Sequence, residues 1–143
     1  MTQLVNHFIC LILDLIVSNV NLLNIIDVIG ICKEYMELVT FTAKTSGKEL
    51  QKRDITLVDQ STMSINLTLW GDDASKFDGQ GNPVILVKGA KIKEFNGSKT
   101  ISPAMGSTIK VNPDIAEAYR LRGWFSNGGN ESVVGNISAR YVT

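Results

Sequence analysis

The sequence has very little of the chemistry that metal sites and disulfide frameworks need. It contains one histidine, His7, and two cysteines, Cys10 and Cys32, without Cys-x-x-Cys spacing. A structural zinc site takes about four nitrogen or sulfur ligands at characteristic spacings. The sequence therefore predicts neither a metal site nor a disulfide-stapled fold, and it favours a reducing compartment. We expect Cys32 to be a small buried hydrophobic residue.

Signatures of catalysis are also missing. There is no nucleophile elbow, and no glycine-rich phosphate loop opens a helix. Asp72 and Asp73 are adjacent acids, but such a pair is typical of the first turn of a helix, where it complements the helix dipole. The sequence predicts a protein that is not an enzyme and has no catalytic residues, no cofactor and no small-molecule substrate.

Net charge is absent as well, because 14 Lys and Arg balance 14 Asp and Glu. The total charge thus indicates neither a nucleic acid nor a membrane as partner. The distribution is more informative, since all the basic residues lie from Lys33 onward. Segments 44–53 and 88–99 each carry four basic residues against a single glutamate. Two such loops form one basic surface if the fold brings them together.

Residues 1–24 form an atypical apolar segment without Lys or Arg. It lacks the basic start and the small-residue cleavage site of a signal peptide. A membrane span needs about 20 predominantly apolar residues, and Asp14 interrupts this run. An amphipathic helix packed on the domain, or a segment with no native partner, is therefore favoured over a membrane span.

From Ile26 onward the chain is a series of short β-branched runs separated by turn residues, which is typical of strands. Asn96-Gly97 is the strongest hairpin signal, and Thr45-Ser46-Gly47 marks another turn. Gly89, inside a long run, predicts a bulge. The stretch after Trp70 predicts a short helix between the third and fourth strands.

Segment 112–123 predicts a C-terminal helix. Asn112 is the expected N-cap, and Pro113 suits the first helical position. Ile115 and Tyr119, four residues apart, are the expected inner face.

The order of these elements indicates an all-β fold of the oligonucleotide/oligosaccharide-binding (OB) class. This is a five-stranded Greek-key barrel with a short helix between strands three and four and a C-terminal helix. We expect it to span residues 25–125, followed by a linker-like tail over 126–143. Trp124 and Phe125 are expected to pack the helix onto the barrel.

Strand alternation places two aromatic residues on polar faces. In segment 64–70, three aliphatic residues share one face, whereas Trp70 shares the other with Thr68. In segment 90–95, Phe95 shares a face with Lys91 and Lys93. Single-stranded nucleic acid is bound by cationic groups along its phosphates and by rings stacked on its bases. The alternation therefore favours nucleic-acid binding over simple packing of the two rings.

The runs DVIGICKEY, KRDITLVD, LTLWGDDASKFD, KGAKIKEFNG and NPDIAEAYRLRGWF carry a family resemblance. Residues 26–125 resemble the second single-stranded-DNA-binding OB domain of the large subunit of eukaryotic replication protein A. The resemblance implies a nuclear ssDNA-binding module of DNA replication, repair and recombination. The resemblance also implies that other replication protein A subunits and repair proteins are further partners.

The resemblance also implies residue roles. The residues matching Trp70 and Phe95 stack on bases, and those matching Lys44, Lys52 and Lys91 approach phosphates. Thr68 matches a polar neighbour of the tryptophan. The alternation of side chains along the strands and the local positive charge add further candidates for ssDNA binding, which are Lys93, Lys48, Arg53 and Lys99.

Two departures and one alternative accompany the resemblance. The hairpin NGSKT is one residue longer than expected, which affects Lys99, and residues 1–24 do not resemble the family's polar linker. The alternative function is a protein-interaction OB domain that receives a peptide in the same groove or at Trp124 and Phe125.

Overall fold

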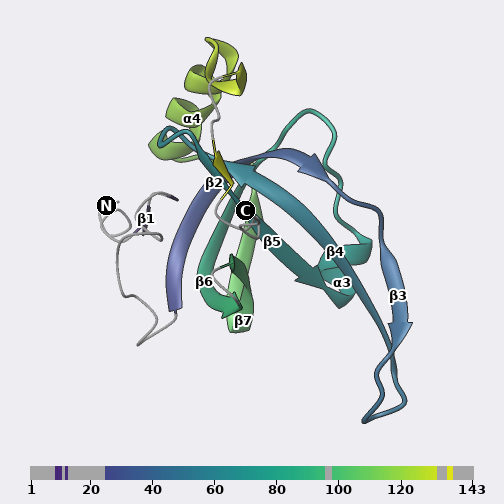
Figure 1. The fold of residues 1–143 in the computed structure, drawn as a ribbon. Coiled ribbons are helices and arrows are strands. Elements are labelled where there is room, and N and C mark those ends of the chain that lie inside the picture. The colour runs from purple at the N-terminus through teal and green to yellow at the C-terminus, as the bar shows by residue number, and fades with distance from the viewer. Residues whose placement is uncertain (1–8, 11, 13–24, 96–97, 132–134, 137–143) are drawn as a thin grey trace, which may run out of the picture.

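Five strands pair in a ring in the computed structural model, which describes residues 9–10, 12, 25–95, 98–131 and 135–136. The neighbours in the ring are β2, β6, β7, β5 and β4, and pairing of β2 with β4 closes it (Figure 1). Pairing is antiparallel except between β5 and β7, which run parallel. The strands are β2 Ile25–Tyr35, β4 Glu49–Val58, β5 Met63–Trp70, β6 Val84–Phe95 and β7 Ser98–Val111. The predicted OB-fold barrel is confirmed.

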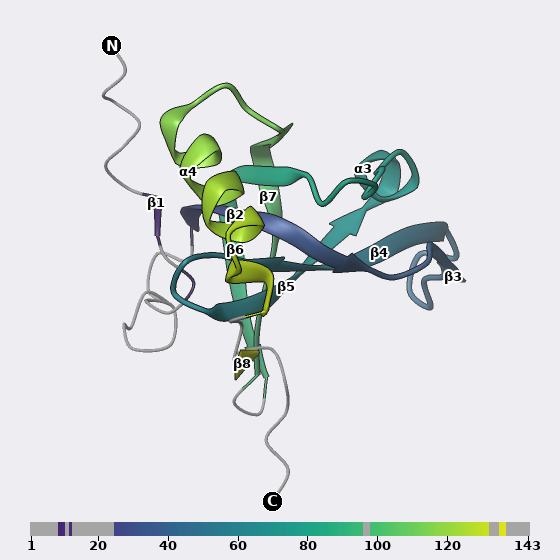
Figure 2. The same ribbon diagram turned by 90° about the horizontal axis from the view of Figure 1, so that it is seen from above.

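The remaining elements lie around this ring. Helix α3 connects β5 to β6, as predicted, and β3 extends the sheet beyond β4 (Figures 1 and 2). Helix α4 covers one end of the barrel. Two short strands, β1 and β8, pair in parallel with β2 and β5. The bounds of all the elements outside the ring are β1 Ile9–Cys10, β3 Val39–Thr42, α3 Gly71–Ser75, α4 Ala116–Ser126, the 3-10 helix η2 Gly129–Glu131 and β8 Gly135–Asn136.

Side-chain alternation produces the barrel core. In β5 the side chains of Ile65, Leu67 and Leu69 are buried inside, as the pattern predicts. In β6 the same holds for Ala90 and Ile92. Successive side chains of a strand point to opposite faces, so the residues between these lie on the outer surface.

The turns follow the predicted chemistry where they are described. Gly47, in the β3–β4 turn, has φ +71°, a conformation that glycine adopts readily. Gly89 has φ +89°, and the β6–β7 register shifts between Lys88 and Ala90, so the predicted bulge is confirmed. Asn96 and Gly97 lie outside the described residues.

The start of the C-terminal helix differs from the prediction, because α4 begins at Ala116 and Ile115 precedes it in an extended conformation. Asn112 is not the N-cap. Its side-chain oxygen accepts the Val84 N–H at 2.9 Å, and its own N–H donates to the Val84 carbonyl at 2.7 Å. The polar groups of Asn112 therefore tie the chain to β6 instead of capping the helix.

The inner face of α4 was also predicted wrongly for Tyr119. Ile115, the N-cap, packs against the cluster that joins α4 to the barrel, as predicted, but Tyr119 is 60% exposed although its N–H donates to the Ile115 carbonyl at 3.3 Å. Ala118 and Leu121 are the buried residues of the helix. The packing role predicted for Trp124 and Phe125 is confirmed, because both lie against the cluster that joins α4 to the barrel.

Part of the N-terminal segment contacts the barrel. Ile9 and Cys10 pair with Asp27 and Val28 of β2. Ile12 is fully buried, and its N–H donates to the buried Asp59 carboxylate at 2.8 Å. The predictions for the rest of residues 1–24 lie outside the described residues. Within the described ranges, no helix is long and apolar enough to cross a membrane. The predicted domain boundaries stay predictions.

Candidate nucleic-acid interface

Trp70 lies at the end of β5 on the outer surface of the barrel. Its side chain is 40% exposed, whereas Leu69 beside it is buried. Lys52 of β4 stands opposite Trp70 in the strand register, and its Nζ lies 6.0 Å from the centroid of the Trp70 ring. This distance is at the outer limit of a cation–π contact. Trp70 therefore presents a partly exposed ring beside a cation, which suits a base and its phosphate.

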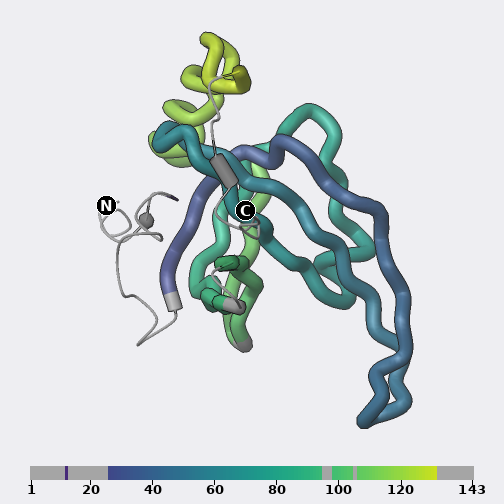
Figure 3. Tube along the Cα trace, in the orientation of Figure 1, coloured from purple at the N-terminus to yellow at the C-terminus, as the bar shows by residue number. Residues whose placement is uncertain are grey.

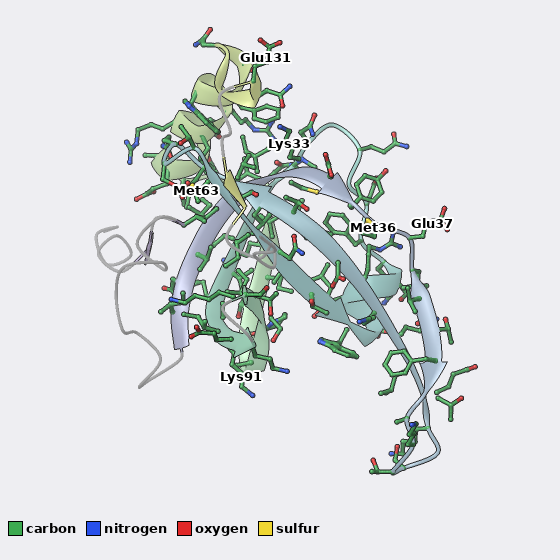
Figure 4. All side chains as sticks on the ribbon, in the orientation of Figure 1. Lys33, Met36, Glu37, Met63, Lys91 and Glu131 are labelled. Carbon is green, nitrogen blue, oxygen red and sulfur yellow. The ribbon has the colours of Figure 1, made fainter. Side chains whose placement is uncertain are left out.

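The outer face continues from β5 to the second basic segment. Lys93 of β6 stands opposite Thr100 of β7, which stands opposite Asn66 of β5. Asn66 in turn stands opposite Thr56 of β4. This row of polar residues crosses four strands, so the two basic segments are joined by one polar surface. Lys91 lies one step along β6 from Lys93 and points away from the lower end of the barrel (Figure 4).

Thr68, the predicted polar neighbour of the tryptophan, forms a hydrogen bond with an acidic residue. Its hydroxyl donates to the Asp54 carboxylate at 2.7 Å, and the two residues stand opposite each other in β5 and β4. A hydroxyl has one donor, so Thr68 keeps only acceptor capacity for another partner. Asp54 also places a carboxylate within the basic face.

Lys44 and Lys48 lie in the turn between β3 and β4, where both are exposed. The β3–β4 hairpin extends well beyond the barrel (Figure 3). It leaves the barrel in a different direction from the β6–β7 hairpin, and β4 and β5 lie between the two (Figures 1 and 2). The lysines of the two predicted basic loops thus flank the strand that carries Trp70.

Arg53 is not brought to this face. It neighbours Lys52 in β4 and therefore projects to the opposite side of the sheet. Its guanidinium donates to the carbonyls of Ala74 at 2.9 Å and Met36 at 3.1 Å. These bonds join β4 to α3 and to the segment between β2 and β3.

Lys99 and Phe95 lie at the β6–β7 hairpin. Lys99 stands opposite Glu94, which partly offsets its charge. Phe95 ends β6 opposite Ser98. The side chain of Phe95 lies outside the described part of the structure, so its predicted stacking role stays a prediction.

The sequence interpretation missed two residues of this surface, Asp54 and Phe41. Asp54 lies two residues after Lys52 in β4 and therefore shares its outer face, which the sequence alone could have indicated. Phe41 of β3 is 37% exposed, and its ring lies edge-on to Trp70 with the centroids 6.2 Å apart. The alternation of Val39 and Phe41 was visible in the sequence, but the register of β3 against β4 was not.

No cluster of His, Cys, Asp and Glu suited to a metal ion occurs among the described residues. The resolved pKa shifts lie away from the outer face. Burial raises the pKa of the Cys32 thiol to about 11, as expected for a buried hydrophobic cysteine. The hydrogen bond from the Tyr119 hydroxyl to Asp114 raises the pKa of that tyrosine.

Comparison with known proteins identifies the family to which the chain belongs. The family model described as the replication protein A OB domain matches residues 15–112. The replication protein A 70 kDa DNA-binding subunit of Drosophila melanogaster is 62% identical over 115 residues, which are 80% of this chain and 19% of that protein. The Mus musculus subunit is 48% identical over 105 residues, which are 73% of this chain and 17% of that protein.

Among solved structures, a replication protein A heterotrimer bound to ssDNA matches with a TM-score of 0.81 at 37% identity. The match covers 91% of this chain and 30% of the matched chain. This chain is therefore an OB-fold domain, and it belongs to the replication protein A OB-domain family. It spans about one fifth of the length of the curated 70 kDa subunits that it matches.

Proposed function

We propose that this domain binds single-stranded DNA with little sequence preference, as a module of a replication protein A large subunit. The observation that supports this best is the exposed Trp70 ring with Lys52 beside it at 6.0 Å. The ring supplies a surface on which any base can stack, and the lysine supplies a cation for the phosphate. Neither contact reads the identity of the base.

The surrounding lysines extend this site along a strand. Lys44 and Lys48 lie on one side of Trp70, on the β3–β4 hairpin, and Lys91 and Lys93 lie on the other side, on β6. Such an arrangement follows a phosphate backbone rather than a single anion. Phe95, at the end of β6, is the second proposed stacking residue. Lys99 and Arg53 are secondary candidates, because Lys99 stands opposite Glu94 in the strand register and Arg53 donates to two backbone carbonyls.

The family supplies the biological setting of the proposal. Its relatives are named as DNA-binding subunits of replication protein A. We assign this domain to nuclear DNA replication, repair and recombination, with the other subunits and repair proteins as further partners. The role is one of binding rather than catalysis.

The test is a titration of the whole chain with fluorescently labelled oligo-dT, followed by anisotropy. Trp70→Ala and Phe95→Ala are each expected to weaken binding by roughly 5- to 150-fold, the equivalent of about 1–3 kcal/mol per stacked base. Tyr119→Ala removes an exposed aromatic side chain from α4 and should leave affinity unchanged. Full affinity in both site variants would contradict the assignment of the site.

The alternative of a peptide-binding OB domain finds less support. Trp124 and Phe125, one of the two surfaces considered for a peptide, pack against the barrel. A parallel titration with peptides from replication and repair proteins separates the two functions. Peptide binding without any oligo-dT binding would favour the alternative.

A further inference from the structure

An apolar strip lies on the β3–β4 hairpin beside Trp70. It consists of Val39, Phe41 and Leu50, whose side chains are 46%, 37% and 36% exposed. These values resemble the 40% of Trp70 itself. Contiguous exposed apolar groups on a small domain commonly mark a binding surface.

Strand register places the strip on the same face as the proposed binding site. Trp70, Lys52 and Val39 stand opposite one another across β5, β4 and β3. Phe41 and Leu50 form the pair two residues further along β3 and β4. Because side chains two residues apart share a face, the strip continues the surface from Trp70 out along the hairpin.

Phe41 also contacts Trp70 directly. Their ring centroids are 6.2 Å apart and their planes are inclined by 67°. This edge-to-face arrangement is favourable for the aromatic pair, and Phe41 remains 37% exposed. The two rings are close enough for adjacent nucleotides of one strand to reach one ring each.

We propose that Phe41, with Leu50 opposite it in β4, is a further base-binding position, which receives the nucleotide next to the one on Trp70. The inference rests on the proposed function. A base suits the strip because Lys52 lies at its inner end, and the exposed Lys44 and Lys48 lie at the hairpin turn beyond its outer end. A strand that follows these cations passes over Phe41.

A tryptophan placed at position 41 tests this directly. In a chain carrying Trp70→Phe, the remaining indole is Trp124, which lies on α4, packs against the cluster that joins the helix to the barrel and should not respond to oligo-dT. Adding Phe41→Trp introduces a new indole on the strip. A base stacked there should quench its fluorescence at the oligo-dT concentration that saturates an anisotropy titration of the same variant.

The matched control places a tryptophan at an exposed aromatic position elsewhere. Tyr119→Trp in the same Trp70→Phe chain should show no quenching, because Tyr119 lies on α4. Binding by the unchanged chain together with an unquenched indole at position 41 overturns this inference alone. Absence of oligo-dT binding by the unchanged chain overturns the proposed function instead.

A second measurement separates a base contact from a purely positioning role. Phe41→Ala should weaken oligo-dT binding about fivefold or more, both in the unchanged chain and in the Trp70→Ala chain. If Phe41 acted only by holding the Trp70 ring, its removal would cost nothing once that ring is absent. A loss confined to the chain that retains Trp70 overturns the inference.

Discussion

The salt dependence of oligo-dT binding should report how many lysines of the outer face reach phosphates. The proposed path has five lysines, which are Lys52, Lys91 and Lys93 on the outer face and Lys44 and Lys48 in the β3–β4 turn. Each neutralised phosphate of a single strand contributes about −0.7 to the slope of log K against log salt. Five contacts give a slope of about −3.5, so binding should weaken about 130-fold between 50 and 200 mM salt.

Lys52→Gln should reduce that slope by about 0.7, so that the same rise in salt weakens binding only about 50-fold. Lys52→Arg keeps the charge and should keep the slope. Lys110→Gln is the matched control, because Lys110 lies beside Leu86 and Pro113 near the start of α4. Titrations at four salt concentrations measure the slopes. An unchanged slope in Lys52→Gln, or an equal change in Lys110→Gln, would refute the assigned phosphate path.

Three further predictions concern Asp54, Asp59 and Cys32. Asp54→Asn removes a negative charge from the outer face and keeps an acceptor for the Thr68 hydroxyl, so oligo-dT affinity should rise, whereas a decrease would show that the carboxylate itself is needed. Asp59→Ala leaves the buried Ile12 N–H without its acceptor and should lower the free energy of unfolding by about 1–3 kcal/mol in urea denaturation. Cys32, with its pKa raised to about 11, should resist iodoacetamide at pH 8 until the chain unfolds, as peptide mass mapping can check. Rapid alkylation of the folded chain at pH 8 would contradict this protection. The contribution of the neutral Cys32 thiol to the free energy of unfolding is full below about pH 9 and should be lost as the pH rises through about 11.

Alternation in single strands was enough to predict much of the fold and the exposure of Trp70 at the centre of the candidate site. It placed Trp70 outside and Leu69 inside because neighbouring side chains of a strand face opposite ways, and both are found so. The bulge at Gly89 followed from the conformational freedom of glycine.

The features that the sequence did not reveal depend on register between segments far apart in the chain. Asn112 looked like a helix cap, but hydrogen bonds to Val84 of β6 engage it. Arg53 looked like a member of the basic cluster, yet it bonds to carbonyls on the other side of β4. Phe41 meets Trp70 only because β4 sets the stagger of β3. Local patterns cannot specify such pairings.

The sizes of the individual contacts determine how the domain can work. Each stacked base contributes about 1–3 kcal/mol, and each lysine's contribution weakens as salt rises. The proposed site has a few rings, five lysines and the Asp54 carboxylate, so we expect it to bind a strand weakly and to release it readily. Linking several such modules makes each further binding event intramolecular and raises the overall affinity by orders of magnitude. The proposed mechanism therefore expects weak binding by this domain alone and much tighter binding when several such modules are joined.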